Sequence, residues 1–124
     1  MMDLSAIKQQ VMFQIGGDAE DVQDFLPYLT RYINDGYDRL TMVAYGQHVG
    51  DGTDDTPALS HDRSIPVLPE WTHPAIADYA TWLICRNGNA QRQNRGYAFR
   101  RAFENVENRL RGARSGRYIC RIPM

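Results

Sequence analysis

Hydrophobic residues recur every three or four positions along most of this chain, with polar residues between them, and this spacing predicts helices. The first expected helix runs from Asp3 to a stop at Gly16. The second begins near Asp24, because Pro27 is tolerated only in a first turn, and it ends near Gly46. Each helix is apolar on one face only, so both must pack against other elements.

A third helix is predicted after the proline-rich stretch in the middle of the chain. Either Thr72 or His73 is its expected cap, and Pro74 falls in its first turn, where a missing backbone N–H does no harm. It is expected to close at Gly88, because glycine favours helix ends. Pro69 and Trp71 precede it and form a stiff lead-in that delivers a large aromatic side chain to the helix entry.

The fourth predicted helix covers residues 89–111 and stops at Gly112. At 1.5 Å per residue it is roughly 35 Å long. Residues 113–124 are expected to form an extended tail that resembles a short strand without an obvious partner. The tail residues that alternate in this way, and that we consider for docking a partner, are Arg117, Tyr118, Ile119, Arg121 and Ile122.

These elements predict one all-α domain over residues 1–124. The 46–69 segment is rich in Gly, Asp, Thr, Ser and Pro, and it forms a long loop with a possible short hairpin. Such long loops are commonly functional, so we expect this one to contact neighbouring molecules. The side chains expected to share one core are Phe25, Leu29, Ile33, Leu83, Phe99, Phe103 and Val106.

Charge is distributed unevenly along the chain. Ten of the 14 basic residues fall in the last 39 positions, all of them arginines, with only two glutamates beside them. That part therefore carries a net charge of +8, while residues 1–85 carry −9. Such asymmetry indicates contact with nucleic acid, with an acidic partner, or between copies that meet acidic end to basic end.

Candidate catalytic chemistry is sparse. Ser60-His61-Asp62 contains the three residue types of a hydrolase triad, but neighbours in sequence cannot adopt the required geometry. The aspartates of the long loop lack the spacing of a calcium loop, and the three histidines share no metal-ligand spacing. Cys85 lies in an apolar helical pattern, which predicts a buried thiol. We therefore expect no cofactor, no metal and no enzymatic activity.

Membrane insertion and export are not expected either. The apolar stretches are far shorter than the ~20 residues that a membrane span needs. The beginning of the chain also lacks the basic and then apolar order of a signal peptide. These features predict a soluble, non-exported protein.

The sequence resembles the small helical adaptor proteins of tailed bacteriophages, also called head-tail connectors or head-completion proteins. The resemblance covers residues 4–111, excluding the acidic loop, and its motifs are structural. They are Tyr32-Ile33-Asn34-Asp35-Gly36-Tyr37, Leu68-Pro69-Glu70-Trp71, His73-Pro74-Ala75-Ile76 with Tyr79-Ala80, and a long helix with Gln91 to Arg95 at its front and Phe99 to Phe103 behind.

The resemblance implies a structural virion protein in the neck between head and tail, present in the host cytoplasm before assembly. Its partners would be further copies of itself in a closed ring of about twelve, the portal protein, a tail or stopper protein, and genomic DNA bound without sequence specificity. Closed cyclic symmetry requires two different faces of each subunit to meet. The opposite charges of the two halves suit that arrangement.

The arginines of the fourth helix are the candidate contact residues in this interpretation. Three roles remain open for them: pairing with carboxylates of a neighbouring subunit, facing phosphates in the DNA channel, or simply lying in solvent. An alternative function is a small arginine-rich nucleic-acid-binding regulator, although no helix-turn-helix is evident. The candidates are Arg92, Arg95, Arg100, Arg101, Arg109 and Arg111.

Overall fold

The computed structural model describes residues 2–16, 25–46, 48–49, 58–88 and 90–121, and side chains in the last range up to Ala113. Within these residues the chain forms four α-helices and two 3-10 turns, and no strand. The all-α expectation is therefore confirmed. The elements are α1 (Leu4–Ile15), η1 (Leu26–Tyr28), α3 (Leu29–Tyr45), η2 (Glu70–Thr72), α4 (His73–Cys85) and α5 (Ala90–Arg121).

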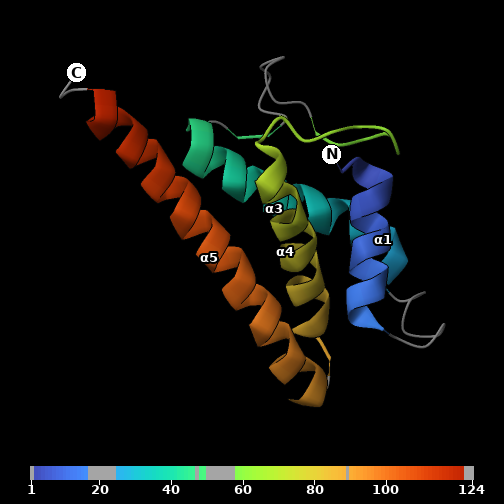
Figure 1. The fold of residues 1–124 in the computed structure, drawn as a ribbon. Helices are drawn as coiled ribbons and strands as arrows, with labels where there is room; N and C mark the ends of the chain where they lie inside the picture. Colours follow the sequence, from blue (N-terminus) through green and yellow to red (C-terminus); the bar gives the residue numbers. More distant parts are fainter. Residues whose placement is uncertain (1, 17–24, 47, 50–57, 89, 122–124) are drawn as a thin grey trace.

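Helix α4 is the centre of the arrangement. It lies between α1 and α5, and α3 crosses behind it, so that α4 contacts all three other helices (Figure 1). Helix α5 is the longest element. It follows α4 along its first turns and then diverges, so its C-terminal end stands clear of the other helices (Figure 1).

The ends of α1 and α3 lie where the sequence predicts them. The Asp3 side chain caps α1 by accepting a hydrogen bond from the backbone N–H of Ala6 at 2.8 Å. Gly16 ends α1 with φ of 56°, and Gly46 ends α3 with φ of 71°. Both angles belong to the left-handed region, which a side chain disfavours and glycine adopts freely.

The two proline-containing helix entries begin with a 3-10 turn. Pro27 lies in η1, so the α-helical part of the second helix begins at Leu29, a few residues later than Asp24. Thr72 occupies the cap position of α4, and Pro74 is in its first turn, as predicted. A helix that begins in this way needs no N–H from the proline.

The prediction of a helix stop at Gly112 and a strand-like tail is wrong. Helix α5 continues through Gly112 to Arg121, so Arg117, Tyr118, Ile119 and Arg121 are helical, while Ile122 lies outside the described residues. Adding residues to an existing helix is far easier than starting one, and a glycine costs only about 1 kcal/mol relative to alanine. A strand, in contrast, would need a partner strand.

The core forms where α1, α3, α4 and α5 meet. Ile33, Tyr37, Ile76 and Phe103 are fully or almost fully buried there. Val106 packs against this core, as expected. Phe99 is only partly buried and lies outside the cluster of core residues. Leu83 is buried but also lies outside the main cluster. Its α4 neighbour Cys85 has a free, buried thiol, as predicted.

The 46–69 loop is bonded to α3 at Val49 and at Leu59. Asp38 accepts a hydrogen bond from the backbone N–H of Val49 at 2.8 Å. Asn34 pairs with the backbone of Leu59, accepting from its N–H at 2.8 Å and donating to its carbonyl at 3.0 Å. The described residues of this loop form no strand, and residues 47 and 50–57, where part of the possible short hairpin could lie, are outside the described residues. No helix among the described residues is both long enough and apolar enough to cross a membrane.

Candidate interaction surface

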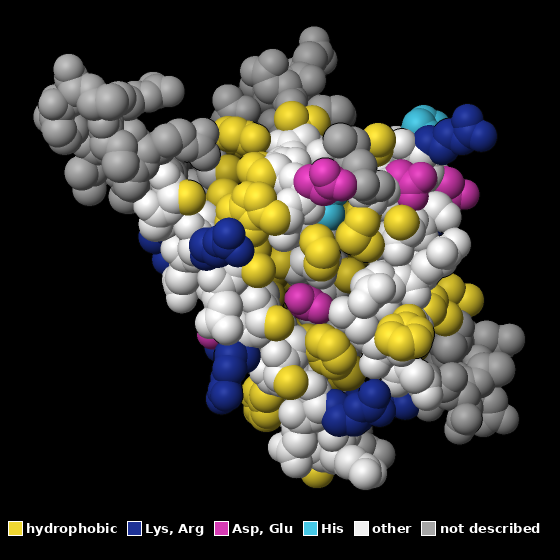
Figure 2. All heavy atoms as spheres, viewed as in Figure 1, with side chains coloured by type: hydrophobic (Ala, Val, Ile, Leu, Met, Phe, Trp, Pro, Cys, Tyr) yellow, Lys and Arg dark blue, Asp and Glu magenta, His cyan; other side chains and the backbone are white. Residues whose placement is uncertain are grey.

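The six candidate arginines all lie on α5, and five of them are exposed, with Arg92 partly buried. On the face shown in Figure 2, basic side chains lie along α5 beside a band of hydrophobic side chains between α5 and α4. The arginines do not share one stripe. Because consecutive residues of a helix are about 100° apart, four of them lie on the two flanks of the buried Phe103 face, Arg92 lies near that face, and Arg101 lies opposite it.

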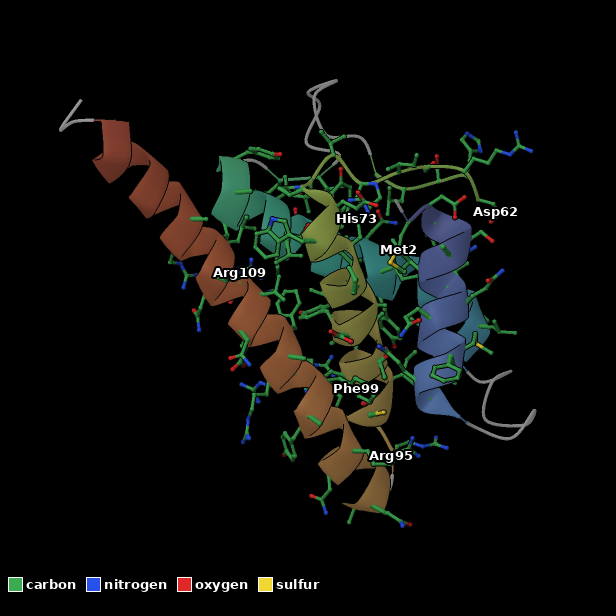
Figure 3. The ribbon with its side chains drawn as sticks, in the orientation of Figure 1. Met2, Asp62, His73, Arg95, Phe99 and Arg109 are labelled. Atoms are coloured by element: carbon green, nitrogen blue, oxygen red, sulfur yellow. The ribbon has the colours of Figure 1, made fainter. Side chains whose placement is uncertain are left out.

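Arg109 is brought together with Trp71, 38 positions earlier in the sequence. Its guanidinium carbon lies 4.5 Å from the centre of the indole ring, within the range of a cation–π interaction. Trp71 is 38% exposed and belongs to η2, directly before α4. Figure 3 shows Arg109 in the middle of α5. The contact joins two candidate groups that the sequence analysis treated separately, the helix entry and the α5 arginines.

Arg100 and Arg95 are also directed toward the protein itself. The Arg100 guanidinium carbon lies 5.1 Å from the centre of the Trp82 ring on α4, and its Nε donates to Glu104 at 2.8 Å. Arg95 donates to the backbone carbonyl of Gln14 at 3.3 Å and extends toward the end of α1 (Figure 3). A positive charge is favourable there, because carbonyl groups without helical partners gather at a helix C-terminus.

Arg101 differs from these neighbours. It is exposed, and no ion pair, hydrogen bond or ring contact joins its side chain to another described residue. Its position is about 200° around the helix from Phe103, which is 1% exposed, so it lies on the side of α5 opposite the core. Arg111 lies ten residues later and donates to the side chain of Asn108 at 3.2 Å. These residues can therefore contact a partner molecule.

The helix entry forms a tightly bonded turn. The Pro69 carbonyl accepts from the N–H of Thr72 at 2.9 Å and from its hydroxyl at 2.6 Å. His73 is 1% exposed; its Nε2 donates to the Leu68 carbonyl at 3.0 Å, and its Nδ1 accepts from the N–H of Met2 at 3.4 Å. Figure 3 shows His73 between the loop and the beginning of α1. The role of this histidine here is structural.

A contact that sequence reasoning missed fixes α5 on α3. Arg39 Nη2 lies 3.1 Å and 3.3 Å from the two carboxylate oxygens of Glu107, which is 8% exposed. The Arg39 guanidinium also lies over the rings of Tyr79 and Phe103, at 5.4 Å and 5.3 Å from their centres. The only signal in the sequence was that Glu107 is one of two acids among ten arginines.

The negative half of the charge asymmetry is carried largely by segments outside the described residues, whereas most of the arginines of the positive half lie on described residues of α5. Among the described residues before Arg86, acids and bases are nearly balanced. Most of the net charge of −9 of residues 1–85 belongs to two short segments, 18–24 and 51–55, which contain no Lys or Arg. Their carboxylates are Asp18, Glu20, Asp21, Asp24, Asp51, Asp54 and Asp55.

A surface pocket of about 270 Å³ lies where η1 meets the α4–α5 turn. The rings of Tyr28 and Tyr32 lie in it with centres 6.3 Å apart and planes tilted by 35°. The remaining lining residues are Phe25, Ile84, Asn87, Gly88 and Arg92. The described lining residues include no acid, histidine, serine or cysteine, and the two tyrosine hydroxyls are their only candidates for proton transfer or nucleophilic attack.

Two titratable groups with shifted pKa values, Asp78 and Cys85, are not among the residues that line this pocket. Burial raises the pKa of Asp78, against the effect of a hydrogen bond from Gln14. Burial also raises the pKa of the Cys85 thiol, which favours the unreactive neutral form. Among the described residues, no group of three or more His, Cys, Asp and Glu side chains is placed to hold a metal ion.

No family model, curated protein or solved structure matches this chain.

Proposed function

We propose that this protein is a non-enzymatic, ring-forming adaptor that joins the portal of a tailed bacteriophage to its tail and surrounds the DNA exit channel. The observation that carries the proposal is the likeness of the 32–37 and 68–80 stretches to adaptors of that kind. Both stretches lie at the centre of the fold: Gly36 packs against Tyr79, and His73 closes the entry to α4. Within these two stretches, Gly36 of α3 and Tyr79 of α4 thus form a close contact between the two helices.

The length of α5 supports an assembly role. Its last described buried residue is Leu110, and the helix continues for a further eleven residues, to Arg121. That extension stands clear of the other helices in Figure 1. In our proposal it docks a partner of the ring, either the portal or the tail-side protein.

The arginines of α5 have two kinds of acidic target in such a ring. Guanidinium groups pair with carboxylates of a neighbouring subunit in a planar, two-pronged geometry, and they attract DNA phosphates without reading base sequence. Because Arg95, Arg100 and Arg109 already contact the protein itself, they also hold α5 in position. The more open Arg101 is the better candidate for a partner.

Mass measurement of the purified protein, with and without the portal protein encoded in the same genome, tests the proposal. An adaptor gives a large complex with the portal, containing about one copy per portal subunit. A gel-shift titration with DNA at several salt concentrations separates it from an arginine-rich regulator. The regulator binds DNA tightly as an isolated protein and ignores the portal, and that pair of results would overturn the proposal.

A further inference from the structure

We propose that Phe13 of one copy of this chain inserts into the pocket at the α4–α5 turn of a second copy. The inference rests on the proposed ring and specifies a contact between its neighbouring subunits. Two observations carry it. One is an aromatic side chain that its own fold leaves exposed, and the other is an aromatic-lined pocket of matching size on another face of the molecule.

Phe13 is the inserting side chain. It is 82% exposed, more than any other large hydrophobic side chain among the described residues. Helix α1 packs on α4 and α3 and buries Leu4, Ile7, Val11 and Ile15. Phe13 is about 200° around the helix from both Val11 and Ile15, so it lies on the side of α1 turned away from the other helices. One exposed phenylalanine is common on protein surfaces, and the pocket is the feature that indicates its partner.

The pocket has the size and the lining for an aromatic ring. Its volume is about 270 Å³. A cavity of about 150 Å³ is enough to bind benzene in a protein interior, so a phenyl group fits here with room to spare. Phe25, Tyr28 and Tyr32 line the pocket, and aromatic rings favour one another at about 4.5 to 7 Å between centres. Arg92 also lines it, and a guanidinium group is attracted to the face of an aromatic ring.

Hydrogen bonds within the α4–α5 turn fix the shape of the pocket. Gln93 Nε2 donates to the carbonyls of Arg86 and Gly88 at 3.2 Å and 3.1 Å. Asn87 Nδ2 donates to the carbonyl of Leu83 at 3.4 Å. Because the turn is already bonded in this way, little has to be ordered when a side chain enters, and a preformed pocket binds more tightly for that reason.

The places of the two features favour a second copy over the Phe13 of the same molecule. The pocket lies where η1 meets the α4–α5 turn, in the part of the fold on which α1 packs. Phe13 lies on the opposite side of α1, and α1 and α5 lie at opposite sides of the fold (Figure 1). The inserting side chain and the pocket thus belong to different faces. A contact between two different faces, repeated around an axis, closes a ring.

One aromatic side chain anchors an interface without forming all of it. Burying an aromatic side chain removes about 150 to 250 Å² from water, whereas a stable interface buries about 800 Å² on each partner. Side chains seated in pockets nevertheless carry most of the binding energy of an interface. Loss of Phe13 should therefore reduce ring formation strongly. It should leave the isolated domain folded, because α1 does not bury this side chain.

Photo-crosslinking tests what Phe13 contacts. p-Benzoylphenylalanine replaces Phe13, and rings are assembled on the portal protein from an equal mixture of isotope-labelled and unlabelled copies. Mass spectrometry then identifies the cross-linked peptides. The inference predicts peptides of mixed isotope content that join position 13 to residues 25–32 or 84–88 of another copy. Cross-links to the portal, within one copy, or to another surface of the neighbour overturn it.

Substitutions on both sides of the contact give an independent test. Phe13→Ser removes the inserting ring, and Asn87→Trp places an indole at the exposed edge of the pocket. Tyr97→Ser is the matched control, since it removes another exposed aromatic side chain, 54% exposed on α5. Circular dichroism first confirms that each variant is folded, and rings on the portal are then counted in electron micrographs.

The expected result is a loss of about tenfold or more in rings for Phe13→Ser and Asn87→Trp, with Tyr97→Ser near wild type. Normal ring formation by folded Phe13→Ser overturns the inference, and so does an equal loss with Tyr97→Ser. Wild-type protein that forms no ring on the portal contradicts the proposed function itself. Rings that form but cross-link from position 13 to a different surface overturn only the inference, so the two failures are distinguishable.

Discussion

Arg39 and Glu107 form an ion pair between α3 and α5 in which Nη2 of the arginine contacts both carboxylate oxygens, at 3.1 Å and 3.3 Å. The carboxylate is almost fully buried, while the guanidinium covers the Tyr79 and Phe103 rings. A buried carboxylate is costly without such a partner. The pair therefore fixes where α5 crosses the body and, with it, how the α5 arginines are presented.

A double-mutant cycle on this pair should give a coupling free energy of about 1 to 3 kcal/mol. The single variants are Arg39→Gln and Glu107→Gln, and the free energy of unfolding is measured with urea. Losing Arg39 alone should be the more damaging change, because it leaves the buried Glu107 without its cation. Additive effects of the two changes would show that the pair contributes nothing as a unit.

Phe103→Ala should lower the free energy of unfolding by about 3 to 5 kcal/mol, because the removed ring lies in the core, in contact with Tyr79 and Arg39. Phe13→Ala is the matched control. Phe13 is 82% exposed on α1, so its loss should change stability by less than about 0.5 kcal/mol. Equal effects of the two substitutions in a denaturant titration would contradict the packing described here.

Two glycines sit at close helix crossings, and alanine should be destabilising at both by about 1 to 3 kcal/mol. A Cβ at Gly96 would lie 2.7 Å from the Cβ of Cys85, and one at Gly36 would lie 2.9 Å from that of Tyr79. Gly112→Ala is the control, since nothing lies within 4 Å of its Cβ position. There alanine should stabilise the continuous helix by up to about 1 kcal/mol. A lower thermal midpoint for Gly112→Ala would argue against helix at that position.

Asp78→Asn should raise stability at neutral pH and leave it little changed in acid. Burial raises the folded-state pKa of Asp78 above its ordinary 3.8. The favourable contribution of this carboxyl to the free energy of unfolding is therefore fully present below pH 3.8 and is lost as pH rises through the raised pKa. Asparagine does not titrate, and it still accepts the 2.8 Å hydrogen bond from Gln14. Partial exposure keeps the gain below about 1 kcal/mol. Thermal midpoints between pH 3 and pH 7 that run parallel for the two proteins would contradict this.

Deleting residues 113–124 should leave the domain folded, because the last described buried residue of α5 is Leu110. The unfolding midpoint should move little, whereas co-sedimentation with the portal or the tail-side protein should be lost if the helical end docks a partner. Unchanged binding of the truncated protein to both partners would assign docking to another surface. A collapse of the far-ultraviolet helix signal would show that the tail supports the core.

The helix boundaries could be predicted where a single residue type dictates the backbone. Asp3, Gly16, Gly46 and Pro74 act through local hydrogen bonding or φ preference, so they are readable from the sequence alone. The same preference of glycine for helix ends led to the wrong prediction of a helix stop at Gly112. Its preference for a helix end is weak compared with the cooperativity of a helix that already has more than twenty residues before it.

The surface of α5 could be predicted only in part. Its arginines are evident in the sequence. The sequence does not show that Arg109 contacts a ring of its own protein while Arg101 remains open, because that contact depends on Trp71, which lies far away in the chain. The Arg39 contact with Glu107 likewise joins residues 68 positions apart. Periodicity identifies which face of a helix is apolar, but it does not identify which helix lies against it or which cation meets which ring.

The central claim, a ring-forming adaptor, is tested most directly by electron microscopy of the portal protein incubated with this protein. The predicted image shows an added closed ring beneath the portal, coaxial with the DNA channel, with α5 reaching a neighbouring subunit or partner. A portal that remains bare at protein concentrations well above those of the portal, while the isolated protein is folded, would contradict the account.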